Sequence, residues 1–371
     1  MQKTYRYRLY PTKKQQTILK DQIECCRWLY NYTLANCNFN YKTNGVFTSY
    51  YDSVKLLPEL RIKKPELEIV YAQVLYDVMR RVECNFKRFF KRCKQRTGKV
   101  GYPRFKNENR YKSITYPQHG YHINDNKTVR ISKIGEIPFI YHRPIKGKIK
   151  SLTIIRTTND KWYISFKVYI DENKVKQKPH NNQIVGIDVG LKTLCTLSDG
   201  NIIENQHWLQ RKEKELKKAK RKLKKIDKDT VKWKKQYKII TTILEKITNR
   251  RKNYILKTVN DLTQKYGTII FENLNIKKML ANPYLKKHIR DASWGFLITS
   301  TINKAEEAGC IVVLVDPRNT SQMCSQCGQL VKKELSVRVH KCPHCGLVMD
   351  RDLNAAKNIL RLGLQSLEHR S

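Results

Sequence analysis

The stretch CSQCGQLVKKELSVRVHKCPHCGLVMDRDLNAAKNIL, residues 324–360, places a cysteine array directly before a group of carboxylates. Two Cys-x-x-Cys pairs, each followed by glycine, are separated by fourteen residues: Cys324, Cys327, Cys342 and Cys345. Four thiolates at this spacing suit tetrahedral Zn²⁺, and the glycines let the backbone turn under the sulfurs. With cysteine at all four positions, no coordination position is left for water or substrate. The sequence therefore predicts one structural Zn²⁺ in a ribbon spanning 320–348. His340 and His344, which lie beside it, are expected to be surface residues or nucleic-acid contacts.

Carboxylates outside the ribbon suggest a second metal site. Asp352 precedes the final helix-like stretch, with Asp350 as a neighbour, while Asp188 lies in an apolar strand and Glu272 ends another. Carboxylates at strand and helix ends can share one cleft, and three of them can hold two Mg²⁺ ions. Two metals can activate water and stabilise the leaving oxygen of a phosphodiester. Each acid alone is often merely solvated, so the prediction rests on the set.

Charge indicates the class of partner. Lys and Arg total 75 against 32 Asp and Glu in 371 residues, which gives a formal net charge of +43. Hydrophobic residues make up 40%, too many for a disordered chain. So much positive charge favours a polyanionic partner, and nucleic acid is the first choice. A ribosome-associated or membrane-surface protein is the alternative; the even spread of basic residues argues against the membrane.

Cysteine usage and hydropathy indicate the compartment. Seven of the eleven cysteines lie outside the ribbon, and an odd number cannot all pair. The longest apolar runs, such as 311–315, are strand-sized, and the N-terminal segment lacks the apolar core of a signal peptide. We therefore expect no membrane association and a reducing cytoplasm, with the protein associated with the nucleoid.

Hydrophobic periodicity predicts an α+β chain of several domains. Residues 1–10 and 110–175 have strand patterns typical of a small β-barrel, and helices fill the intervening 11–109. The polar segment 171–183 marks the boundary of a second, α/β half covering 183–371. That half alternates apolar strands with helices, and one helix has ten Lys or Arg among the fifteen residues 211–225.

Several motifs together resemble one family. GIDVGLKT, FENLNI, NTSQMCSQCG…CPHCG and DRDLNAAKNI occur in this order, and YRLYPTKKQ, CCRWLYN and YPRFK match further upstream. The chain resembles the TnpB family of transposon-encoded, RNA-guided DNA nucleases, which are similar to small type V CRISPR effectors. The resemblance implies a RuvC-like nuclease domain of RNase H fold, interrupted by the ribbon. It also implies that Asp188, Glu272 and Asp352 are the catalytic Mg²⁺ ligands; Asp352 is preferred to Asp350 because the D-x-N-A-A pattern aligns there.

The resemblance also implies the partners. A guide RNA derived from the transposon end would be held by the wedge-like barrel, with one protein chain per guide RNA. The helical insertion would help to read a short motif beside the double-stranded DNA target, and base pairing with the guide would select that target.

Individual nucleic-acid contacts are predicted from local chemistry. Basic residues bordering the motifs or on the basic helices could meet phosphates, and one amide could read bases. A solvated helix face is the open alternative for most of them. The candidates are Lys192, Arg221, Arg250, Arg251, Arg318 and Gln73.

Other functions compete with guided cleavage. A catalytically silent RNA-guided repressor would be expected to lack one or more of the three acids, and all are present. A zinc-ribbon DNA-binding accessory of transposition has no need of Asp188, Glu272 and Asp352. A strand-transfer transposase of RNase H fold is chemically close, and the family resemblance disfavours it.

Overall fold

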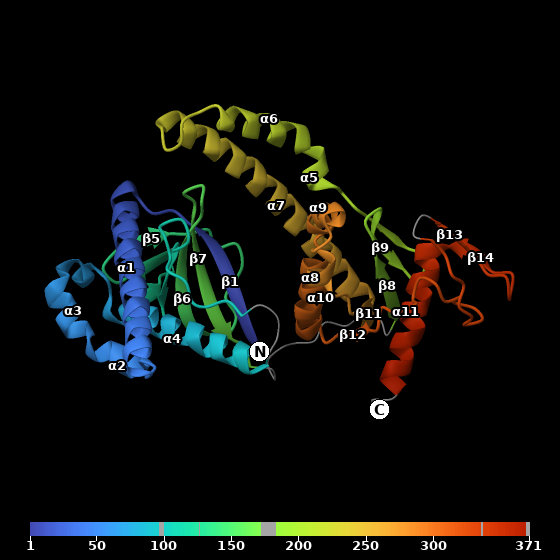
Figure 1. Ribbon diagram of the computed structural model, residues 1–371, viewed down its shortest axis with the longest axis horizontal. Coiled ribbons are helices and arrows are strands. Elements are labelled where there is room, and N and C mark those ends of the chain that lie inside the picture. Colours follow the sequence, from blue (N-terminus) through green and yellow to red (C-terminus); the bar gives the residue numbers. More distant parts are fainter. Residues whose placement is uncertain (96–99, 126, 172–182, 335–336, 369–371) are drawn as a thin grey trace. The chain divides into compact units, whose positions relative to one another are not determined.

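The chain is described by a computed structural model, which defines all residues except 96–99, 126, 172–182, 335–336 and 369–371 (Figure 1). Internal contacts divide it into two units, Met1–Lys174 and Val175–Ser371. Most of the predicted boundary segment, 171–183, lies outside the described residues. Across the described ranges, every helix is too short or too polar to cross a membrane.

Unit 1 contains two antiparallel sheets. The larger has the order β1-β7-β6-β2, formed by β1 (Gln2–Leu9), β7 (Trp162–Tyr169), β6 (Lys148–Arg156) and β2 (Ser113–Tyr116). The smaller consists of β3 (Tyr121–Ile123), β4 (Thr128–Ile131) and β5 (Gly135–Pro138). A bridge between Leu9 and Phe139 links them. The strands therefore form two linked sheets, and a closed barrel stays a prediction.

Helices fill the chain between β1 and β2, as expected. They are α1 (Lys13–Asn44), α2 (Tyr50–Lys55), α3 (Leu57–Lys63), the 3₁₀ turn η1 (Pro65–Ile69) and α4 (Ala72–Gln95). The Thr12 hydroxyl accepts from the Gln15 amide at 3.3 Å, and the Gln15 side chain accepts from the Thr12 amide at 3.0 Å. This capping box starts α1 because it satisfies two amides that have no partner within the helix.

Unit 2 is built on one mixed sheet of order β10-β9-β8-β11-β12. Its strands are β8 (Ile184–Val189), β9 (Thr193–Leu197), β10 (Ile202–Glu204), β11 (Thr268–Glu272) and β12 (Ile311–Val315). β8, β9 and β10 pair antiparallel, whereas β11 is parallel to both β8 and β12. Side chains alternate across the sheet, so Ile269 and Phe271 share a core with α7 and α10, whereas Ile270 packs with Ile359 of α11.

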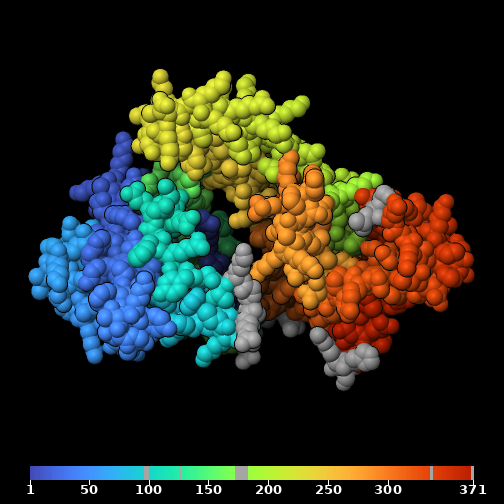
Figure 2. Space-filling view, in the orientation of Figure 1, coloured from blue at the N-terminus to red at the C-terminus, as the bar shows by residue number. Residues whose placement is uncertain are grey.

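The helices of unit 2 are α5 (Trp208–Arg211), α6 (Glu213–Lys224), α7 (Val231–Lys265), α8 (Ile276–Met279), α9 (Pro283–Ala292), α10 (Trp294–Ala308) and α11 (Arg351–Glu368). The hairpin of α6 and the first half of α7 extends beyond the sheet of its own unit (Figure 1). A small core holds it together: Leu216, Ala219, Ile240, Ile243 and Ile247. On the face drawn in Figure 2, side chains project from the surface of this hairpin.

Candidate functional site

The three predicted carboxylates come from elements that meet in unit 2. β8 and β11 run parallel with Ile187 opposite Phe271, so Asp188 and Glu272 come next on two adjacent strands. Because Ile187 and Phe271 face the core formed with α7 and α10, alternation directs Asp188 and Glu272 to the face covered by α11. Asp352 lies in the first turn of α11, the helix that packs against β8.

The pKa of Asp188 reflects both burial and neighbouring carboxylates. Burial, followed by repulsion from the carboxylates of Glu272 and Asp352, raises this pKa to about 8. Arg351 opposes this shift. Glu272 is 8% exposed, and burial raises its pKa despite a hydrogen bond from Thr320. Neighbouring carboxylates repel one another when ionised, so this group of acids favours a proton or a cation.

Glu272 is held by residues that the sequence analysis missed. The Thr320 hydroxyl donates a hydrogen bond to Glu272 Oε1. Asn358 of α11 donates from Nδ2 to the carbonyl oxygens of Thr320, at 2.9 Å, and Met323, at 2.6 Å. Asn354, one turn earlier, donates to the Met323 carbonyl at 2.7 Å and accepts from the Ser325 amide at 2.9 Å. The spacing of two asparagines four residues apart in DLNAAKN was the available signal.

Asp352 and Asp350 have different partners. Asp352 Oδ1 accepts from Arg351, from Nε at 3.1 Å and from Nη2 at 2.9 Å, and Arg338 Nη1 lies 3.7 Å from Oδ2. Asp350 Oδ1 accepts from the amides of Asp352, at 2.8 Å, and Leu353, at 3.1 Å. Asp350 therefore caps α11, whereas Asp352 is paired with arginine.

The carboxylate donors fit Mg²⁺ in kind, because this ion prefers carboxylate and water oxygens. The oxygens of the three carboxylates do not all lie close together. Within the described residues, only the four ribbon cysteines have all their ligand atoms within 4.8 Å of one another. A metal held by Asp352 would have to replace its contact with Arg351.

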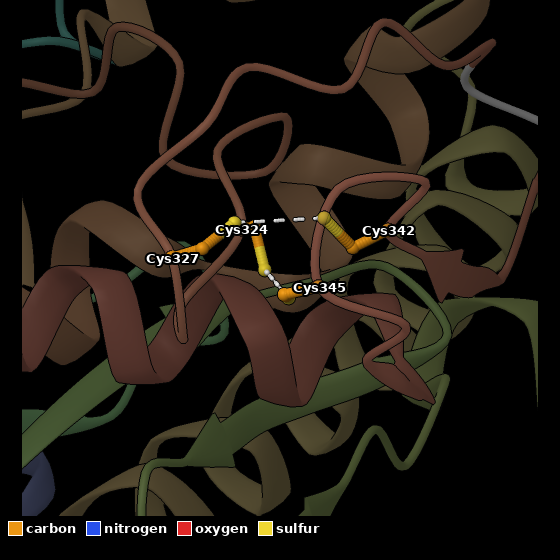
Figure 3. A group of neighbouring side chains, drawn as sticks. All are labelled: Cys324, Cys327, Cys342 and Cys345. Atoms are coloured by element: carbon orange, nitrogen blue, oxygen red, sulfur yellow. Dashed lines mark hydrogen bonds between the residues drawn. The ribbon is translucent and has the colours of Figure 1, made fainter.

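The ribbon cysteines form the second site (Figure 3). The sulfurs of Cys324 and Cys345 lie 3.6 Å apart, as do those of Cys327 and Cys342. The two loops have the same hydrogen bonding: the Gly328 amide donates to the Cys324 carbonyl, and the Gly346 amide donates to the Cys342 carbonyl. Both glycines have positive φ, +77° and +73°, which other residues rarely adopt. Four thiols whose sulfurs all lie within 4.8 Å of one another fit Zn²⁺, which prefers four such ligands.

Local polarity favours a thiolate in this cluster. Burial alone would raise the pKa of Cys342, but the backbone amides of Cys345 and His344 and the neighbouring thiols lower it to about 6. The expectation that His340 is at the surface is wrong: its side chain is fully buried and its Nδ1 contacts the Lys333 amine. It lies on β13 (Val339–Lys341), which pairs with β14 (Val348–Asp350), and inward alternation buries it.

The predicted nucleic-acid residues differ in their surroundings. Lys192 and Arg221 are exposed, and neither has an ion pair within the described part of the chain. Arg250 lies over the Trp208 ring at 5.8 Å. Arg318 is exposed and donates to Asp316 from Nε at 2.8 Å.

Two of these candidates have structural partners. Arg251 donates to the Arg290 carbonyl at 3.0 Å and lies 3.7 Å from a carboxylate oxygen of Asp291. The Gln73 side-chain oxygen accepts from the His119 amide at 3.3 Å. Their roles toward nucleic acid stay predictions, and Arg251 has the clearest structural one.

Family models match three segments, which together cover more than half of the chain. Residues 1–45 match a "Helix-turn-helix domain" and residues 165–282 a "Probable transposase", both of the OrfB_IS605 type. Residues 294–359 match the "Cas12f1-like, TNB domain". In this structure residues 1–45 form β1 and the single long helix α1.

Whole-chain relatives agree with these matches. The chain is 27% identical to "Putative RNA-guided DNA endonuclease InsQ" of Escherichia coli (strain K12), covering 97% of this chain and 92% of the relative. It is 29% identical to a "Putative RNA-guided DNA endonuclease" of Streptomyces pristinaespiralis, covering 98% and 90%. It is also 28% identical to "TnpB-like protein L79" of Acanthamoeba polyphaga mimivirus, covering 60% and 45%.

A solved structure shares the fold. The "mini-RNA-guided endonuclease CRISPR-Cas_phi3" matches with a TM-score of 0.53 at 10% identity, covering 98% of this chain and 92% of that one. This likeness supports a mixed α+β fold of several domains, and this chain itself has a four-cysteine cluster near its C-terminus. The three family matches and the two relatives that span nearly the whole chain lead to one assignment: the chain belongs to the TnpB/OrfB_IS605 family and is related to Cas12f.

Proposed function

We propose that this protein is a transposon-encoded, RNA-guided DNA endonuclease that cleaves target DNA beside a short adjacent motif by two-metal phosphodiester hydrolysis. The observation that supports the proposal is that Asp188 and Glu272 lie on adjacent strands and face α11, the helix that carries Asp352. The names of the E. coli and Streptomyces relatives support the same activity.

The sheet order supports a RuvC-like domain of RNase H fold over 183–371. The sheet has three antiparallel strands, β10, β9 and β8, followed by β11 and β12, which run parallel to β8. With α11 on the face opposite α7 and α10, this is the topology expected of that fold. We assign 320–348 to an inserted zinc ribbon, 1–10 and 110–175 to a wedge-like domain, and 11–109 to a helical recognition insertion.

The three carboxylates would hold Mg²⁺, which supplies the charge that activates water and stabilises the leaving oxygen. Glu272 is oriented for this by the Thr320 hydroxyl, and α11 orients Asp352. Asp188, whose pKa lies near 8, would release its proton on becoming a ligand. The buried position of Glu272 limits competing contacts with water.

The ribbon would hold one structural Zn²⁺ through its four thiolates. Ser325 and Met323 are hydrogen-bonded to Asn354, so a folded ribbon fixes the start of α11 and with it Asp352. We infer that the partners are a guide RNA derived from the transposon end and double-stranded DNA, with one protein chain per guide RNA. A net charge of +43 supports binding to such polyanions.

A catalytically silent, RNA-guided DNA-binding repressor is the second candidate. The contact between Arg351 and Asp352 is the observation that favours it, because the arginine already neutralises the third carboxylate. The presence of all three acids favours cleavage.

One experiment separates these functions. The protein is expressed with its transposon end and purified, and the bound RNA is sequenced and used to design a matching DNA target. Guided cleavage in Mg²⁺ that stops without divalent metal is the expected result. Guided binding without cleavage would support the repressor, and the absence of bound RNA would contradict both.

A further inference from the structure

A pocket in unit 1 is formed around the YPRFK segment, which none of the roles above uses. It has a volume of about 320 Å³ and lies between α1, α4 and the segment after residue 100. Four basic side chains and two aromatic ones line most of it: Arg92, Arg104, Lys106, Arg110, Tyr102 and Phe105. Ligand pockets in proteins measure about 300–1,000 Å³, so this one suits a group the size of a single nucleotide.

Hydrogen bonds to α1 fix the wall of this pocket. Asn31 accepts from the Lys106 amide through Oδ1 and donates to the Lys106 carbonyl through Nδ2, both at 2.9 Å. Arg27 donates to the same carbonyl at 3.2 Å. The Tyr102 hydroxyl donates to Asn38 Oδ1 at 2.7 Å. The segment is therefore held in place before any ligand binds, which lowers the entropic cost of binding.

The charge in the pocket is uncompensated. The described residues that line it include no Asp or Glu. Some arginines of unit 1 do have a carboxylate partner, as Arg81 has Asp77. Arg92, Arg104 and Arg110 have no ion pair with any described residue. Burial, and then the charge of Arg81, lower the pKa of Lys106. Like charges collected without a counter-charge favour an anion, and arginine matches phosphate geometry.

The aromatic rings point to more than a simple anion. Tyr102 is 44% exposed and Phe105 56% exposed, although both are large apolar groups. The Lys106 amine lies over the Tyr30 ring, 4.3 Å from its centre, so the amine occupies the ring face on which a base would otherwise stack. Exposed aromatic rings beside arginines are the combination that binds single strands, because bases stack on the rings while cations hold the backbone.

We propose that this pocket binds one unstacked nucleotide of a nucleic-acid strand, with its phosphate held by Arg92, Arg104 and Arg110 and its base stacked on Phe105 or Tyr102. The inference rests on the nucleic-acid binding of the proposed function and is independent of cleavage. The strand is either DNA or RNA, since both supply this chemistry.

Cross-linking and affinity measurements on the full-length chain test the inference. Labelled 20-nucleotide single strands of one sequence, as DNA and as RNA, are the probes, with a blunt DNA duplex and inorganic phosphate as comparisons. Ultraviolet cross-linking followed by peptide mass spectrometry is expected to identify the peptide that holds Tyr102 and Phe105. The arm with the stronger cross-link identifies the strand.

Matched variants make the measurement specific. Phe105→Leu should weaken single-strand binding about 5-fold or more, the lower end expected for losing one stacked base. Arg104→Gln should weaken it and reduce the salt slope by about 0.7. The controls are Phe39→Leu, an exposed phenylalanine of α1, and Arg88→Gln, an exposed arginine one turn before Arg92; both should bind within twofold of the parent.

Three results would overturn the inference. One is a Phe105→Leu variant with the melting temperature and the single-strand affinity of the parent. Another is equal weakening by Arg88→Gln and Arg104→Gln, which would indicate diffuse attraction. The third is displacement of the strand by millimolar phosphate with no effect of Phe105→Leu, which would indicate a simple anion site. If the parent binds no nucleic acid at all, the proposed function fails instead.

Discussion

Gly186 of β8 and Ala356 of α11 lie in direct backbone contact: a Cβ atom on Gly186 would stand 2.4 Å from the Ala356 carbonyl oxygen. Gly186 is two residues before Asp188, and Ala356 is one helical turn after Asp352. The close approach of these two backbones therefore sets the separation of two of the three carboxylates.

Gly186→Ala should accordingly destabilise unit 2 and reduce cleavage. The added methyl group also meets the Leu360 amide, so the helix must move, and overpacking of this kind costs about 1–3 kcal/mol. Thermal unfolding and a cleavage assay measure the two effects. Gly295→Ala is the control. The Cβ atom added there would lie at an ordinary contact distance, 3.4 Å, from Ile276 Cδ1, and alanine favours the helix. Equal melting temperatures for the parent and Gly186→Ala would contradict the packing argument.

Thr320→Val should raise the Mg²⁺ concentration needed for cleavage. Valine keeps the shape of the buried threonine but removes the hydroxyl that donates to Glu272. Loss of a partner that orients a metal ligand typically costs about 10–100-fold in metal affinity or activity. Thr320→Ser keeps the hydroxyl and should stay near the parent. A Mg²⁺ titration that gives the same midpoint for valine and serine would remove Thr320 from the site.

The pKa of Asp188 predicts a pH dependence of stability. Its value rises from 3.8 to about 8 on folding, so between these limits the folded state binds the extra proton. The stability that the folded state gains by holding this proton is fully present below pH 3.8 and is lost as the pH rises through 8. In buffer without added Mg²⁺ and with ribbon zinc retained, urea unfolding should show parent stability falling from pH 5.5 to 7.5. Asp188→Asn should show less of this fall; identical slopes would contradict the prediction.

Zinc removal should act at a distance on the carboxylate site. The parent should contain one Zn²⁺ per chain, and Cys324→Ser should lower this content and weaken cleavage, because the ribbon positions Asn354 and α11. Cys84→Ser, at an exposed cysteine outside the ribbon, is the control. Metal analysis and cleavage rates are measured on the parent, Cys324→Ser and Cys84→Ser. A parent protein that cleaves DNA without containing zinc would contradict the assignment of the ribbon as a zinc site.

Patterns local in sequence were predictable. The strands that carry Asp188 and Glu272 are apolar runs, and β8 and β11 form where expected. The cysteine spacing likewise foretold the cluster.

Contacts between distant segments were not predictable. Thr320 and Glu272 are 48 residues apart in sequence and meet only after β11, the ribbon and α11 have packed. Arg251 looked like a phosphate contact on a basic helix, but tertiary structure gives it the Arg290 carbonyl and Asp291. His340 is buried because β13 pairs with β14, which its polar surroundings in the sequence did not indicate.

The Asp188→Ala variant tests the central claim most directly, with cleavage in Mg²⁺ and binding measured on the same guide RNA and DNA target. Binding should be retained, because it would come from base pairing and dispersed basic contacts and not from the Asp188 carboxylate. Cleavage should be lost, and Glu272→Ala and Asp352→Ala should behave alike without additive effects. Cleavage by Asp188→Ala at near the parent rate would contradict the account.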